Sequence, residues 1–151
     1  MTQEDKKLLL QDLCARLPYD VKVCYENNTY YLNEINPACK EIMISVLIQD
    51  ENRQWCAESV LIENIKPYLR PMSSMTDEER EEWTDLFLIS VVTELEQYSD
   101  DEAEDIAPKL YASSHVKSLN WLNKHHFDYN GLIEKGLAIE VTEENNPYKE
   151  K

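Results

Sequence analysis

The fold class is decided by the stretch Val21-Lys22-Val23-Cys24-Tyr25-Glu26-Asn27-Asn28-Thr29-Tyr30-Tyr31-Leu32. Apolar and polar residues alternate along its first half, which is typical of a β-strand with one buried face. Asn27 and Asn28 tolerate the left-handed backbone conformation of a tight turn, and the aromatic residues that follow favour a returning strand. The stretch therefore predicts a β-hairpin near the start of the chain.

Further short strands are expected after this hairpin. Apolar residues alternate between two faces along residues 42–48, and a polar turn at 49–53 separates them from Trp55 and from the apolar run 60–62. Strands spaced by about ten residues favour a small antiparallel barrel of the SH3-like kind, or a curled sheet. An open sheet packed on a first helix is the alternative.

That first helix is expected over residues 3–17. Thr2 and Asp5 have the spacing of a helix cap, and leucines then recur at helical intervals until Pro18 ends the pattern. The sequence therefore predicts that a helix precedes the β-rich segment.

The second half of the chain is expected to be helical. Pro67 and Pro71 disfavour a central strand, so residues 70–75 are interpreted as a connector. Thr76 and Glu79 form a capping-box pattern, after which apolar residues repeat at helical spacing to about Tyr98.

Two shorter helices complete the expected helical half. They cover residues 114–124 and 129–135, with an acidic loop or frayed helix end at 99–105 before them and Gly136 as the final stop. The sequence thus predicts an α+β chain in four parts. They are an N-terminal helix with a β-domain (1–69), a connector (70–75), an acidic subdomain of about three helices (76–143) and a mobile tail (144–151).

Charge and composition exclude several function classes. The 151 residues include 30 acidic and 15 basic residues, which gives a net charge of −15. Segment 77–105 alone holds 13 acidic residues against the single Arg80. Direct binding of nucleic acid is therefore disfavoured. Only 2 residues are glycine, so phosphate-binding glycine loops are not expected.

The sequence favours a cytoplasmic protein that does not span a membrane. The leucines at 8–10 make too short an apolar run for a signal peptide, and no 18-residue apolar run occurs. The four cysteines show no CxxC pair, so they are expected to be free thiols.

No catalytic or metal-binding residue can be assigned from the sequence. His115, His125 and His126 invite a zinc interpretation, but adjacent histidines point in different directions, and neither an HExxH motif nor a close cysteine pair is present. No nucleophile, base and stabilising group can be named together. We therefore expect a protein that is not an enzyme and needs no cofactor.

Two groups of residues are candidate binding positions, and each has an alternative structural role. Aromatic and polar residues concentrate near residue 125 and are typical of interface hot spots, or of the core of a helical hairpin that contains its own turn. Basic and aromatic residues near the connector either contact the acidic helix or form an exposed recognition strip. The candidates are Trp121, His125, His126, Asp128 and Tyr129, together with Lys66, Tyr68 and Arg70.

Two stretches of the chain resemble a known family. They are Ile62-Glu63-Asn64-Ile65-Lys66-Pro67-Tyr68-Leu69-Arg70-Pro71-Met72-Ser73-Ser74-Met75-Thr76 and Leu119-Asn120-Trp121-Leu122-Asn123-Lys124-His125-His126-Phe127-Asp128-Tyr129-Asn130-Gly131-Leu132-Ile133-Glu134-Lys135-Gly136-Leu137-Ala138. Both resemble the signature stretches of a family of small uncharacterised proteins from phages, prophages and mobile elements of Bacteroides and related gut bacteria. The resemblance implies a bacterial cytoplasmic setting and a mobile-element origin, and no activity.

Two functions remain open, with an enzyme as a third. The first is a non-catalytic accessory protein that binds another protein of the host or phage. The second is an inhibitor whose acidic segment imitates the charge of DNA and occupies a basic cleft of a host defence or nucleic-acid-binding protein. The alternative role of the acidic segment is that of a solvated helix face that maintains solubility.

Overall fold

The computed structural model describes residues 1–36, 43–49, 54–87 and 89–149. The chain forms two compact units. The first joins Met1–Met72 to His126–Lys151, and the second is Ser73–His125. Parts of four predicted elements lie outside the described residues. They are residue 42 of an expected strand, residues 50–53 of the expected turn, residue 88 of an expected helix and residues 150–151 of the expected tail.

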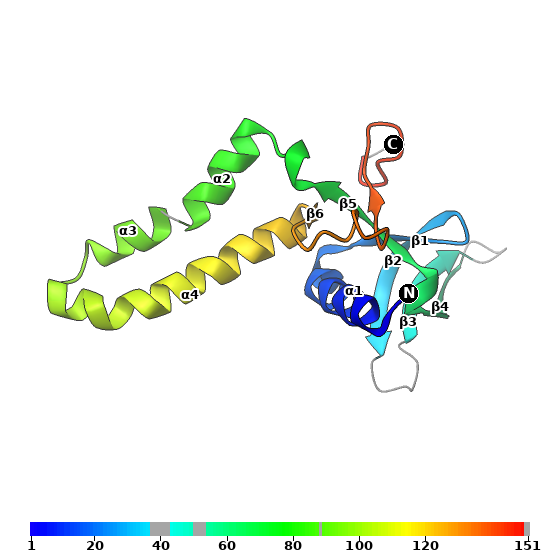
Figure 1. Ribbon diagram of the computed structural model, residues 1–151, viewed down its shortest axis with the longest axis horizontal. Helices are drawn as coiled ribbons and strands as arrows, with labels where there is room; N and C mark the ends of the chain where they lie inside the picture. Colours follow the sequence, from blue (N-terminus) through cyan, green and yellow to red (C-terminus); the bar gives the residue numbers. More distant parts are fainter. Residues whose placement is uncertain (37–42, 50–53, 88, 150–151) are drawn as a thin grey trace. The chain divides into compact units, whose positions relative to one another are not determined.

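Helix α1 (Gln3–Arg16) packs on the sheet of the first unit (Figure 1). Its predicted cap is confirmed, since the Asp5 backbone N–H donates to Thr2 Oγ1 and the Thr2 N–H donates to the Asp5 carboxylate, each at 3.1 Å. Leu9 and Leu13 are fully buried against the sheet. A single 3₁₀ turn, η1 (Leu17–Tyr19), follows the helix at Pro18.

The strands of the described residues form one mixed sheet with the order β4-β3-β2-β1-β5-β6, and β7 also pairs with β5. Four pairs of neighbouring strands are antiparallel: β1 with β2, β2 with β3, β3 with β4, and β1 with β5. Strands β6 and β7 run parallel to β5. The strands are β1 (Lys22–Tyr25), β2 (Asn28–Asn36), β3 (Met43–Gln49), β4 (Trp55–Leu61), β5 (Lys66–Pro71), β6 (Phe127–Asp128) and β7 (Ile139–Glu140).

Of the two predicted forms of the sheet, a small antiparallel barrel or a curled sheet, the barrel is wrong, because the sheet is mixed and does not close. A barrel would need the free edge of β5 to pair with the other end of the sheet. In the structure β6 occupies this edge at Arg70 and Pro71, and β7 occupies it at Tyr68 and Leu69. The sheet therefore stays open and packs on α1, which was the alternative arrangement. Pro67 and Pro71 both belong to β5, so the predicted connector begins inside a strand.

The predicted hairpin is present, with its turn one residue earlier than expected. Tyr25 pairs with Asn28, so the two loop residues are Glu26 and Asn27. Their φ angles are +49° and +63°, which is the left-handed conformation required by the tight turns that join twisted strands. Asn28 instead begins the returning strand.

The core of the first unit lies between α1 and the sheet. It draws on α1, on several strands, on a 3₁₀ turn η2 (Ile62–Asn64) and on the C-terminal segment after β6. Its buried members are Leu9, Leu13, Val21, Val23, Leu32, Ile44, Val46, Val60, Ile62, Ile65, Leu69, Leu132, Leu137 and Ala138. Because residues 132–138 belong to this core, the C-terminal segment is part of the β-rich unit and not of the helical one.

The second unit is a helical hairpin that follows a short 3₁₀ turn, η3 (Met72–Ser74). Helices α2 (Asp77–Phe87) and α3 (Ile89–Leu95) run antiparallel to the long helix α4 (Asp100–Lys124) (Figure 1). The capping box at Thr76 and Glu79 is confirmed, with hydrogen bonds of 3.0 and 3.1 Å. No helix among the described residues has the length and apolar character needed to cross a membrane.

Two of the predicted helices are corrected. Helix α4 begins at residue 100 instead of 114, because the Glu102 carboxylate accepts hydrogen bonds from the Ser99 N–H and hydroxyl and caps the helix there. Pro108 lies inside this helix. Residues 129–135 form turns instead of a helix, because the carboxylate of Asp128 binds the backbone N–H groups that a helix would need.

Candidate interaction surface

Strand β5 carries the three candidate residues near the connector. Lys66 is exposed at the first position of the strand. The half-buried Tyr68 accepts a hydrogen bond from Thr29 Oγ1 at 3.3 Å, and burial raises the pKa of its phenol. The guanidinium of Arg70 lies 4.2 Å from the centroid of the Phe127 ring. Tyr68 and Arg70 therefore help to hold the sheet together, and of these three residues Lys66 is the most open to a partner.

Two candidate residues, Trp121 and His125, lie at the end of α4. Trp121 is 6% exposed, and its ring stacks on that of His125 with centroids 4.0 Å apart. The His125 N–H donates to the Trp121 carbonyl, and its Nδ1 lies 3.9 Å from Glu79 Oε1. This arrangement fits the packing interpretation of Trp121, because a buried indole has little surface to offer a partner.

The chain turns at His126 after α4 and then enters strand β6, which holds Asp128. His126 has a φ of +59°, and its ring stacks on Tyr148 at 3.9 Å between centroids. Asp128 is 8% exposed, and its two carboxylate oxygens accept hydrogen bonds from the N–H groups of Leu132 and Ile133 at 2.9 and 2.8 Å. A carboxylate used in this way fixes the path of the following turn.

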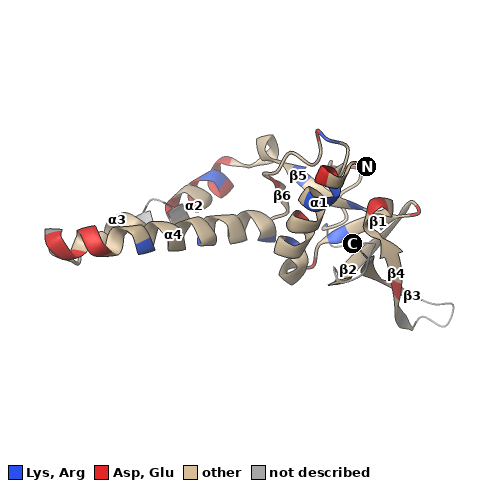
Figure 2. Cartoon of the chain, turned by 60° about the horizontal axis from the view of Figure 1, so that its bottom comes forward, with Lys and Arg blue, Asp and Glu red and all other residues tan. Residues whose placement is uncertain are grey.

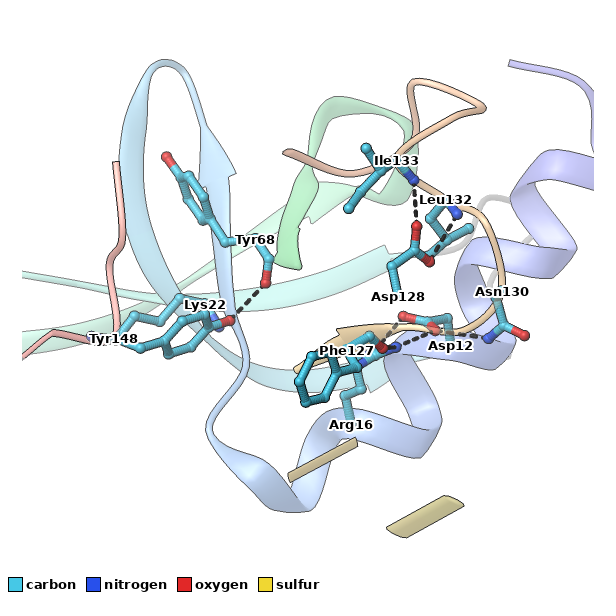
Figure 3. A network of polar contacts seen from close by, with 10 residues as sticks. All are labelled: Asp12, Arg16, Lys22, Tyr68, Phe127, Asp128, Asn130, Leu132, Ile133 and Tyr148. Atoms are coloured by element: carbon cyan, nitrogen blue, oxygen red, sulfur yellow. Dashed lines mark hydrogen bonds and ion pairs between the residues drawn. The ribbon is translucent and has the colours of Figure 1, made fainter. Parts of the chain in front are cut away.

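A buried ion pair of α1 contacts strand β6 and the residues that follow it (Figure 3). Arg16 is fully buried and makes a bidentate contact with the buried Asp12, at 2.6 and 2.9 Å. Arg16 also donates to the Phe127 carbonyl at 2.8 Å, and its guanidinium lies 5.3 Å from the centroid of the Tyr129 ring. Asn130 donates to Asp12 at 2.8 Å. Tyr129 thus takes part in the internal contacts of the first unit.

The C-terminal segment is attached to β1 and β5 through Tyr148 (Figure 3). Its hydroxyl donates to the Tyr68 carbonyl at 2.9 Å and accepts from the Lys22 N–H at 3.1 Å, and burial raises the pKa of its phenol. Lys22 Nζ donates to the Pro147 carbonyl. The predicted mobile tail therefore has a packed portion at Tyr148. A polar cavity of about 650 Å³ beside it includes Lys22, Tyr31 and Tyr148 in its lining.

The helical unit carries an apolar groove of about 420 Å³. Side chains from α2 and α4 line it: Trp83, Thr84, His115, Ser118, Leu119 and Leu122. Leu119 is 45% exposed, and Val116 on the same helix is 57% exposed. Large apolar side chains left open beside a groove are typical of a surface that binds another molecule.

Acidic side chains accompany this groove. Figure 2 shows them along α2 and at the beginning of α4. The exposed ones are Asp77, Glu78, Glu81, Glu82 and Asp85 of α2, and Asp101, Glu102, Glu104 and Asp105 of α4. The unit Ser73–His125 holds 13 acidic and 4 basic residues. A partner of the groove therefore meets exposed carboxylates along α2.

The comparisons with known proteins identify no relative: no family model, curated protein or solved structure matches this chain. Within the described residues, no three His, Cys, Asp or Glu side chains are grouped to hold a metal ion. Among the described cysteines, Cys14, Cys24 and Cys56 form no disulfide, and Cys39 lies outside the described residues.

The sequence predicts the acidic segment but does not predict the groove. Trp83, Leu119 and Leu122 belong to helices whose apolar residues recur at helical spacing, and that spacing alone does not show which part of a helix face stays open. The buried ion pair has a sequence signal, since Asp12 and Arg16 stand four residues apart beside the leucines of α1.

Proposed function

We propose that this chain is a non-catalytic protein-binding module that acts in the bacterial cytoplasm as an accessory protein of a phage or mobile element, and that it binds its partner through the groove between α2 and α4. One observation carries the choice of surface: the groove is apolar, and Leu119 beside it leaves 45% of its surface in water. By contrast, Trp121 and Asp128 are buried, so they are poor anchors for a partner.

The size of the surface supports a protein segment as its ligand. A single groove of about 420 Å³ is within the range of small-molecule pockets as well. However, Val116 on α4 and Val92 on α3 add exposed apolar side chains to the same unit, at 57% and 55% exposure. Apolar surface spread along two helices favours a helix or loop of a protein over a compact small molecule.

The test compares two neighbouring substitutions on α4. Leu119→Glu places a charge in the groove, whereas Asn120→Glu adds the same charge at an exposed neighbour that is not part of the lining. Consecutive helical residues point about 100° apart, so the two changes face different directions. The chain and both variants are used to capture proteins from a Bacteroides lysate, and circular dichroism checks that all three are folded.

A partner retained by the parent chain and by Asn120→Glu, but lost with Leu119→Glu, supports the proposal. Capture of the same proteins by all three chains would remove the groove as the binding surface. Thr84→Glu, on the α2 side of the groove, is the second variant if Leu119→Glu is unfolded.

A DNA-mimic inhibitor is the second candidate, and the nine exposed carboxylates of α2 and early α4 favour it. Under this proposal the captured partner binds DNA, duplex DNA displaces it, and high salt releases it. The substitution Leu119→Glu then has little effect, because charge and not the groove drives binding. Capture that survives high salt and excess duplex DNA would exclude this candidate.

A further inference from the structure

The walls of the groove come from two antiparallel helices. Trp83 and Thr84 lie on α2, and His115, Leu119 and Leu122 lie on α4. Two packed helices leave a furrow between them along their shared length, and a third helix placed in it completes a small bundle. The form of the groove therefore matches an α-helix better than an extended strand, which needs an open sheet edge.

The groove residues of α4 follow a helical stripe. His115, Ser118, Leu119 and Leu122 stand at positions i, i+3, i+4 and i+7, and Tyr111, which is 49% exposed, precedes them by one turn. At 1.5 Å per residue, the stripe from Tyr111 to Leu122 is about 16 Å long. A docked helix of about three turns covers this length and contributes apolar side chains with the same spacing.

The charged residues of the helical unit indicate which charge a docked helix would carry. The unit Ser73–His125 has 13 acidic and 4 basic residues, and all of the acidic ones lie at 77–105. Beside the groove the carboxylates therefore lie along α2, whereas α4 carries the exposed Lys109, Lys117 and Lys124 there. On α2 the exposed Glu81 precedes the groove residue Thr84 by three positions, so the two side chains are neighbours on the helix surface. Basic residues that flank an apolar stripe speed the encounter with such a surface, and acidic residues are repelled.

We propose that the groove binds an amphipathic helix of a partner protein, with an apolar stripe that fills the furrow and with Lys or Arg on its flanks. This inference rests on the proposed function and adds the chemical class of the partner. A second copy of this chain does not meet the charge requirement, because each copy has a net charge of −15 and the two acidic units repel each other.

The probes are three synthetic peptides of about 18 residues, a length that spans about 27 Å as a helix. The first has Leu at helical spacing and Lys on its flanks. The second has the same composition in an order that destroys the stripe, and the third has Glu in place of Lys. Binding to the full-length chain is measured by isothermal titration calorimetry, with the parent, Leu119→Glu and Asn120→Glu.

We expect the first peptide to bind with one-to-one stoichiometry, and the second and third to bind at least tenfold more weakly. The substitution Leu119→Glu makes the chain more acidic, so binding by charge alone would be kept or strengthened. Occupation of the groove instead predicts at least a tenfold loss with Leu119→Glu and little change with Asn120→Glu. The opposite responses separate a groove ligand from a non-specific polycation.

Several outcomes would overturn the inference. Equal binding of the stripe and scrambled peptides means that charge alone is recognised, and equal binding of the Lys and Glu peptides means that charge plays no part. A concentration-dependent dimer in analytical ultracentrifugation that Leu119→Glu abolishes would make a second copy the occupant. If no peptide binds while a lysate partner is still lost with Leu119→Glu, the proposed function stands and the helical class of the partner is wrong.

Discussion

Replacing Arg16 by Met is expected to destabilise the first unit strongly. The substitution leaves the Asp12 carboxylate, which is 1% exposed, without its bidentate partner. It also removes one donor of the Phe127 carbonyl, which keeps the hydrogen bond from the Tyr129 N–H at 3.2 Å. Removing one member of a buried ion pair costs about 3–5 kcal/mol. Domains of this size are stable by about 5–15 kcal/mol, so the loss is a large fraction of the total.

The double variant Asp12→Asn with Arg16→Met gives the decisive comparison. With both charges removed, no buried ion is left unpaired, and the remaining cost is that of unsatisfied polar groups, about 1–3 kcal/mol. The double variant should therefore be more stable than Arg16→Met alone. Lys7→Met, at an exposed position of the same helix, is the control and should change stability by less than about 0.5 kcal/mol.

Urea denaturation followed by circular dichroism measures these differences. The reasoning is refuted if Arg16→Met costs less than about 1 kcal/mol, the size of an ordinary surface effect, or if the double variant is as unstable as the single one. Either result would mean that the ion pair is not the link between α1 and strand β6.

Three further predictions follow from single contacts. Asp128→Ala removes the acceptor of two backbone N–H groups and should lower the free energy of unfolding by about 1–3 kcal/mol in urea denaturation, without weakening capture of a partner by the folded protein. Tyr148→Phe removes the hydroxyl that bonds Lys22 and Tyr68, and should speed hydrogen exchange at the Lys22 amide; unchanged exchange would show that the tail is not attached there. Hydrogen bonds from Ser99 hold the pKa of Glu102 below its usual value, so this support of α4 is complete above the usual pKa and is lost as the pH falls through the lowered one. Titration followed by NMR should show the lowered pKa, and Ser99→Ala should raise it part of the way to its usual value, because the variant loses the hydroxyl but keeps the backbone N–H.

Local sequence patterns predicted those parts of the fold that depend on near neighbours. The caps at Thr2 and Thr76 each need a hydroxyl and a carboxylate three residues apart, and both are present as expected. The hairpin with its turn at residue 26 follows from the alternation of apolar and polar residues along its first strand and from turn residues that tolerate a positive φ. Ser99 and Glu102 have the same spacing, although the sequence predicts an acidic loop or frayed helix end at 99–105; α4 begins there and also accommodates Pro108, a residue that is unfavourable inside a helix.

Two kinds of contact account for the wrong predictions: the pairing of distant strands, and local hydrogen bonds from backbone N–H groups to a side chain. Whether the sheet closes depends on which strand takes the free edge of β5, and this strand, β6, comes more than 50 residues later in the chain. Residues 129–135 have helical spacing, but the Asp128 carboxylate captures the N–H groups at their start. Neither event leaves a periodic signal, since each depends on a few groups brought together by folding.

The sequence by itself determined the α+β class, the N-terminal helix, the hairpin and the concentration of negative charge in residues 77–105. Tertiary structure alone decided that the sheet stays open, that Trp121 and Asp128 are buried, and that Leu119 remains exposed beside a groove. The physical reason is that propensity, capping and charge act over a few residues, whereas burial depends on which distant segments cover a given side chain.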